Sequence, residues 1–163
     1  MEPAGWVIEA AQALQASPLG QAARRSPTLY PGANVVHLAG LVTLVGSAVL
    51  LDLRILGVGR QLALPATSRL LSRTAAFGLL LAALSGLVLF SGDAVSLAGS
   101  PIFQAKLSLI AMALLCAGAF RLRYGDLDRW PDRPPLGARG LAGMSLALWP
   151  AVGTLGRLIG YEA

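Results

Sequence analysis

The sequence predicts an all-α protein: an integral membrane four-helix bundle with interfacial amphipathic helices at its N-terminus. The first observation is composition, since the 163 residues are 55% hydrophobic and only 13% charged, with a mean hydropathy of +0.66. A soluble domain normally carries about 25% charged residues. The second is a series of long uncharged stretches, each near the roughly 20 residues that one helical crossing needs. We interpret residues 1–163 as a single membrane domain.

Residues 1–30 are expected to form interfacial helices that are retained. They lack the basic start and the uninterrupted apolar core of a signal peptide. Val7 and Leu14 fall on one apolar helical face, whereas Gln15 falls outside it. Ser17 followed by Pro18 is typical of a helix cap and a first-turn proline, and predicts a second short helix.

Four spans are predicted at about residues 33–57, 71–92, 101–121 and 136–160. The Tyr30-Pro31 step is expected to break the chain before the first span, and residues 93–100 are expected to form a loop. Small residues spaced by four predict close helix contacts, namely Ala39-Thr43-Ser47 in the first span and Gly78-Ala82-Gly86 in the second.

The basic residues predict an orientation in a bacterial inner membrane. Nine of the 13 lie in or beside the connections between spans 1 and 2 and spans 3 and 4: Arg54, Arg60, Arg69, Arg73, Arg121, Arg123, Arg129, Arg133 and Arg139. The positive-inside rule places these connections in the cytoplasm and both termini on the outer side. The abundance of Ala, Leu and Arg is typical of a GC-rich bacterial genome.

The partner expected from this composition is the lipid bilayer, with a homo-oligomer or a larger membrane complex as further possibilities. Nucleic acid is excluded as a partner because the basic residues flank apolar spans and are not interleaved with exposed aromatic side chains.

Four polar residues share a depth near the outer side. His37, Lys106 and Arg157 come from three predicted spans, and Tyr161 lies at the same rim together with Asp93 and Glu162. Ionisable groups within spans usually face the interior of a bundle, so these residues are candidates for an outward-facing pocket that takes a small anionic ligand or a lipid headgroup. In the alternative interpretation, Lys106 and Arg157 extend to lipid phosphates and His37 hydrogen-bonds to a neighbouring helix.

A second polar group lies at the cytoplasmic side. Asp52, near the end of the first span, is opposite the start of the second, so Arg69 or Arg73 is expected to neutralise it as a structural ion pair. A proton relay is the alternative. Arg54 points away from Asp52 on a helix of ~100° per residue and is expected to reach the headgroups.

Catalytic patterns are absent from the sequence. One histidine and one cysteine, Cys116, do not make a His/Cys metal cluster, and no phosphate-binding glycine motif precedes a Lys-Ser or Lys-Thr pair. No catalytic residue is assigned, and a non-enzymatic accessory or binding protein is favoured over an enzyme.

Several short motifs together resemble a known family. They are Ser-Pro-Thr-Leu-Tyr-Pro before the first span, His37-Leu38-Ala39-Gly40, Asp52-Leu53-Arg54-Ile55-Leu56-Gly57, Phe103-Gln104-Ala105-Lys106 and Gly156-Arg157-Leu158-Ile159-Gly160-Tyr161. The chain resembles bacterial four-helix inner-membrane proteins of unknown function. More distantly, it is similar to four-helix b-type cytochromes and copper-resistance D-type membrane proteins.

This resemblance implies an alternative function, a membrane electron-transfer subunit that holds haem b. His37 would then be the axial metal ligand, with Lys106 or Arg157 pairing with the propionates. Members of the family often have Asn and His late in the third span, where this chain has Cys116 and Arg121. That difference does not fit a haem held by two histidines of one chain.

Overall fold

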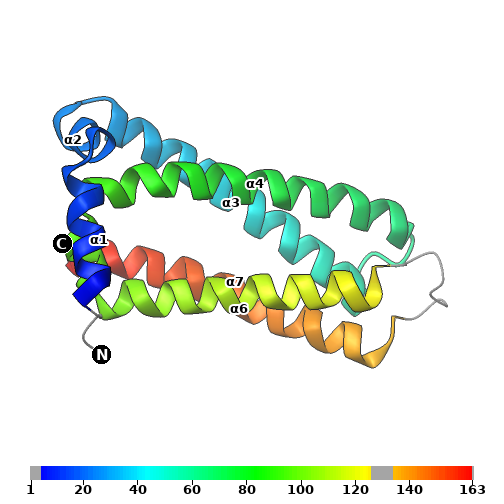
Figure 1. The fold of residues 1–163 in the computed structure, drawn as a ribbon. Helices are drawn as coiled ribbons and strands as arrows, with labels where there is room; N and C mark the ends of the chain where they lie inside the picture. The colour runs from blue at the N-terminus through cyan, green and yellow to red at the C-terminus, as the bar shows by residue number, and fades with distance from the viewer. Residues whose placement is uncertain (1–4, 126–133, 163) are drawn as a thin grey trace.

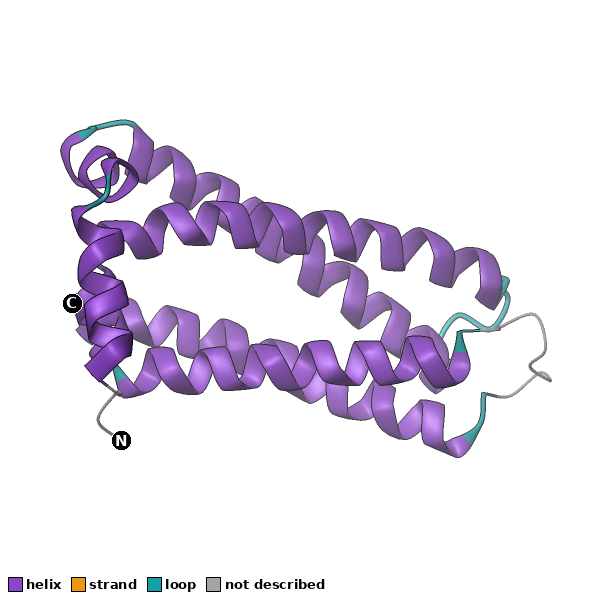
Figure 2. Ribbon diagram, in the orientation of Figure 1, coloured by secondary structure: helices purple, strands orange, loops and turns teal. Residues whose placement is uncertain are grey.

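The computed structural model describes residues 5–125 and 134–162, and side chains as far as residue 159. Within these residues the chain is all-helical, as predicted, and contains no strand (Figure 2). The helices in chain order are α1 (Gly5–Ala16), α2 (Pro18–Arg25), α3 (Leu29–Leu56), α4 (Leu64–Gly92), α5 (Ala94–Gly99), α6 (Pro101–Tyr124) and α7 (Leu136–Glu162).

Three of the described helices, α3, α4 and α6, are long and apolar enough to cross a membrane. Many of their apolar side chains lie on the outside of the structure. Val42 is 73% exposed, Leu70 66% and Leu115 72%. Such exposure suits lipid rather than water as the surrounding medium, since soluble monomers rarely expose large contiguous apolar patches.

Two helices begin earlier than predicted. α3 starts at Leu29 and contains Tyr30 and Pro31, so this step does not break the chain. α4 starts at Leu64 with Pro65 in its first turn. Both corrections have the same reason: the first-turn amide has no helical acceptor, so proline costs little there.

The long helices form two antiparallel pairs. α3 packs along α4, α6 packs along α7, and the principal contact between the pairs is made by α3 and α7. Figure 1 shows the pairs diverging toward the end of the molecule that carries α1 and α2. We call this the capped end, and the opposite end, which carries the α3–α4 connection, the loop end.

Glycines bring α3 and α4 into backbone contact. A Cβ added to Gly40 would lie 2.6 Å from the amide nitrogen of Ala82, and one added to Gly78 would lie 2.5 Å from that of Leu44. Helices approach this closely in membranes when small residues line their contact. The stripe predicted on the second span is therefore the contact face of α4, but α3 uses Gly40 and Leu44 rather than the predicted stripe that begins at Ala39.

The two helix pairs share a core along α3 and α7. Near the middle, Leu44, Ala113 and Trp149 are buried together. Toward the loop end, Ile55 is buried against Ala138 and Ala142. The small alanines allow α3 and α7 to approach there, whereas the capped end has no equivalent cluster between these two helices among the described residues.

The capped end is covered by α1, α2 and α5. Ala11 of α1 is buried against Ala94 and Ala98 of α5, so the apolar face of α1 packs on protein. The segment expected to be a loop therefore contains a short helix that supplies this contact.

Two polar contacts fix the connections within the cap. Gln15 accepts a hydrogen bond from the amide of Val95 at 3.0 Å, so this side chain is a contact residue and does not point elsewhere as predicted. The predicted cap at Ser17 is confirmed, since its hydroxyl accepts a hydrogen bond from the amide of Gly20 at 3.2 Å.

Candidate functional site

His37 lies on α3 at the capped end, with its ring against α4. Its Nδ1 donates a hydrogen bond to the carbonyl oxygen of Ala82 at 2.8 Å and lies 3.2 Å from the hydroxyl oxygen of Ser85. A carbonyl oxygen only accepts, so Nδ1 carries the hydrogen in this geometry. In the neutral imidazole, Nε2 is then an unprotonated acceptor.

The packing of α3 on α4 explains this position. The Gly40 and Gly78 contact holds the backbones close, which brings the ring within reach of a main-chain carbonyl. Gly86 provides space for the ring, because a Cβ there would lie 3.0 Å from His37 Cε1. Ser85 is itself oriented by donating its hydroxyl to the carbonyl of Leu81.

Lys106 comes from α6 and reaches α7. Its side chain is partly buried and crosses Gly156, where an added Cβ would lie 3.3 Å from Nζ and 3.5 Å from Cε. The ammonium is also near enough to His37 for its charge to act on the imidazole. The structure thus brings His37 of one helix pair and Lys106 of the other into the same region of the capped end.

The structure gives less information on the other two predicted pocket residues, Arg157 and Tyr161. Arg157 directly follows Gly156 on α7, and its side chain is exposed. The side chain of Tyr161 lies outside the described residues. We call His37, Lys106 and Gly156 the His37–Lys106 site; Arg157 is the next residue on α7.

The carbonyl of Ala82 and the hydroxyl of Ser85 were not among the predicted site residues. A sequence signal for them exists, because Ser85 lies beside Gly86 in the small-residue stripe that forms the α4 contact face. Finding the partner of His37 requires the α3–α4 register, which the stripe alone does not supply.

Asp52 forms a separate polar feature toward the loop end. The residue is only 7% exposed, and its Oδ2 is buried without a hydrogen-bond partner. The side chain of Ser145 on α7 lies near enough to interact with this carboxyl group. Arg69 and Arg73 are exposed on α4, and among the described residues neither forms an ion pair with Asp52.

Arg54 also has a partner other than the one expected. Instead of extending to headgroups, its guanidinium donates to the carbonyl of Leu62 from Nε at 2.9 Å and from Nη2 at 2.7 Å. These bonds close the α3–α4 connection. The carbonyl oxygens of this turn satisfy the guanidinium because the left-handed Gly57 and Gly59 reverse the chain beside it.

Metal-binding side chains are sparse in the part of the chain that the structure describes. No group of three or more His, Cys, Asp or Glu residues is gathered there, and Cys116 is buried in α6 without a disulfide. His37 is the only histidine of the chain. A metal centre built on this chain would have His37 as its sole imidazole ligand.

Comparisons with known proteins identify no relative of this chain. No family model, no curated protein and no solved structure matches the chain.

Proposed function

We propose that the protein is a non-enzymatic, four-span membrane accessory protein whose His37–Lys106 site binds a small anionic ligand or a lipid headgroup. The observation that carries this proposal is that an oriented imidazole and a partly buried ammonium, whose charge acts on the imidazole, occupy the same region at the diverging end of the helix pairs. A bound anion would offset the free-energy cost of removing the Lys106 ammonium from water. In this proposal α7 is the fourth membrane crossing, beside the three apolar helices α3, α4 and α6.

The chemistry of the site narrows the ligand class. The anionic oxygens face Lys106 and Arg157, whose donors suit phosphate or carboxylate groups. His37 Nε2 accepts a hydrogen bond, so the ligand also carries a hydroxyl group. Phosphatidylglycerol in the bilayer and glycerol phosphate in solution share these two features.

Binding of both probes to the purified protein tests the proposal and distinguishes the sources. Nanodiscs containing phosphatidylglycerol or phosphatidylcholine report headgroup binding by retention of the lipid, and calorimetry with glycerol 3-phosphate reports binding of the soluble anion. Lys106→Gln should lower the affinity for whichever probe binds better by about tenfold, which is the equivalent of one charge-assisted hydrogen bond. Binding of neither probe would contradict an anion site with this chemistry.

Two further variants separate binding from packing. His37→Asn places an amide donor near the position of Nδ1 and keeps the bond to Ala82, but it lacks the acceptor at Nε2; folding should survive while binding falls. Gly156→Ala puts a methyl group against Lys106 Nζ without changing charge, and Gly153→Ala is its control because no neighbour lies within 4 Å. Equal binding by the two alanine variants would argue against Lys106 as a ligand contact.

The orientation of the proposed four spans is testable through two exposed glutamines. Gln61 lies in the α3–α4 connection and Gln12 on α1. With Gln12→Cys, a membrane-impermeant maleimide should label intact cells, whereas with Gln61→Cys it should label only after permeabilisation. The wild type is the control because its Cys116 is buried. The reverse labelling pattern would contradict external termini.

The same histidine geometry favours a second candidate, haem b with His37 as the axial ligand. Metal-binding histidines commonly donate their other ring N–H to a carbonyl oxygen, as Nδ1 does here. A bis-histidine site would need a second chain to supply the other imidazole. Protein from a haem-replete host should then show a Soret band that His37→Asn removes; a colourless protein after haem reconstitution would exclude this function.

A further inference from the structure

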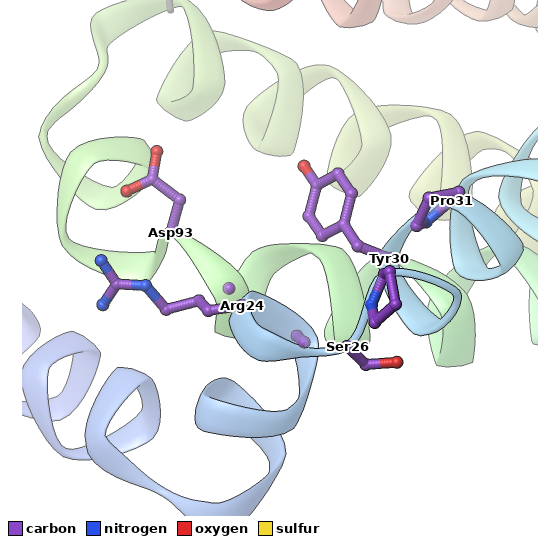
Figure 3. Close-up of a pocket in the computed structure, with 8 residues that line it drawn as sticks. Arg24, Ser26, Tyr30, Pro31 and Asp93 are labelled. Atoms are coloured by element: carbon purple, nitrogen blue, oxygen red, sulfur yellow. The ribbon is translucent and has the colours of Figure 1, made fainter.

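An open pocket of about 510 Å³ lies on the capped end, apart from the His37–Lys106 site. It forms where the end of α2, the start of α3 and the end of α4 meet, and Figure 3 shows the side chains around it. The residues that matter for its chemistry are Arg24, Tyr30 and Asp93. Gly92 shapes the wall, because a Cβ there would lie 3.4 Å from the ring of Tyr30 and 3.6 Å from Cβ of Ala23.

The pocket holds one cation and one anion that do not pair with each other. Arg24 and Asp93 are both exposed, and within the described part of the chain neither takes part in an ion pair. Figure 3 shows both charged groups on the same side of the pocket, with the ring of Tyr30 across from them. Opposite charges that line one pocket without pairing suit a ligand that carries both charges itself.

The backbone around the pocket is held in place by local hydrogen bonds. Ser26 accepts from the amide of Leu29 at 3.1 Å and thereby joins the end of α2 to the start of α3. On the other side, Gly20 brings α2 against α4, because an added Cβ would lie 2.8 Å from the carbonyl oxygen of Ser91. Arg24 is thus presented on a packed helix and not on a free terminus.

We propose that this pocket binds the zwitterionic headgroup of an ethanolamine phospholipid. The guanidinium of Arg24 takes the phosphate, which it can contact with two parallel N–H donors. The carboxylate of Asp93 takes the primary ammonium, and the ring of Tyr30 adds a cation–π contact. The two-carbon spacer of ethanolamine keeps the phosphate and the ammonium as separate charges, one for each residue.

The position of the pocket favours a lipid over a soluble ligand. It opens at the ends of the two apolar helices α3 and α4, and tyrosine is enriched at the headgroup level of membrane proteins. Ethanolamine is favoured over choline because only a primary ammonium has N–H donors for Asp93. It is favoured over glycerol because a glycerol headgroup leaves Asp93 facing an anionic lipid without a counter-charge.

Native mass spectrometry of the full chain released from mixed nanodiscs provides the test. Equal amounts of ethanolamine, choline and glycerol phospholipids are offered, and the part of the retention that depends on Arg24 and Asp93 should be larger for the ethanolamine lipid than for the other two; glycerol lipid held at the His37–Lys106 site does not depend on these residues. Arg24→Gln and Asp93→Asn should each reduce retention of the ethanolamine lipid by about tenfold, whereas Arg25→Gln and Glu9→Gln, matched changes at exposed residues outside the pocket, should not. Equal losses of the three lipids in the pocket variants, or equal effects of pocket and control variants, would overturn the proposal.

A second arm separates the lipid from its soluble headgroup. Soluble phosphoethanolamine should raise the melting temperature of lipid-depleted protein less than the ethanolamine lipid does; an equal effect would overturn the assignment to a lipid. Because His37 and Lys106 are unchanged in all these variants, failure here leaves the anion-binding test of the proposed function unaffected. The reverse also holds, since Lys106→Gln does not alter this pocket.

Discussion

Substitution of Gly78 by alanine should separate α3 from α4 and lower the free energy of unfolding. The added Cβ would lie 2.5 Å from the amide nitrogen of Leu44 and 2.8 Å from the carbonyl oxygen of Gly40. Both neighbours are backbone atoms, so no change of rotamer relieves the contact, and the helices must move apart by roughly 1 Å to restore van der Waals separation. Forced overpacking of this kind costs about 1–3 kcal/mol.

Alanine also favours the helix over glycine by about 1 kcal/mol, which would partly offset the clash. Gly46→Ala is the matched control, because it lies within α3 with no neighbour inside 4 Å and should gain the same helix propensity. The difference between the two variants in equilibrium unfolding, measured in mixed detergent micelles, therefore isolates the clash. Equal stability of the two variants would refute the close contact of α3 with α4.

Three other perturbations test separate contacts. Asp52→Asn should raise the melting temperature in detergent, by about 1 kcal/mol or more in stability, because it removes a buried charge whose Oδ2 has no partner; unchanged or lower stability would indicate a counter-charge. Arg54→Ala should accelerate limited proteolysis of the connection at 57–63, because the bonds to Leu62 are lost; an unchanged rate would show that the turn closes without them. Gln15→Leu should increase amide exchange at Val95 about fivefold, as expected for one hydrogen bond of about 1 kcal/mol; unaltered exchange would mean that the cap does not depend on this bond.

The local signals in the sequence predicted helices better than they predicted helix ends. Ser17-Pro18 correctly predicted both the cap and the start of α2, because the side chain and the ring act within one turn. Tyr30-Pro31 was misleading for the opposite reason: proline disfavours a helix when it falls beyond the first turn, and Pro31 lies within the first turn of α3. The sequence alone does not show at which residue the first turn begins, so α3 extends further toward its N-terminus than predicted.

Contacts between helices were only half predictable. The stripe that ends at Gly86 does face α3, since glycine and alanine are small enough to allow backbone contact. On α3, however, several stripes of small residues compete, and the structure selects the one through Gly40. Which stripe is used depends on the surface of the neighbouring helix. In the same way, the rotation of α3 and α7 about their axes decides that Ser145, and not an arginine, lies beside Asp52.

The two ends of α3 place polar groups by different means, and this difference bears on where the proposed ligand would fit. At the loop end, Ala138 and Ala142 bring α7 directly against α3, so Asp52 is enclosed and no large group can approach it. At the capped end the helix pairs diverge, and the side chain of Lys106 lies across Gly156 of its own helix pair while its charge acts on His37 of the other pair. A ligand could move this side chain without breaking a helix contact, whereas access to Asp52 would require α3 and α7 to separate. The diverging end is therefore better suited than the loop end to the reversible binding proposed above.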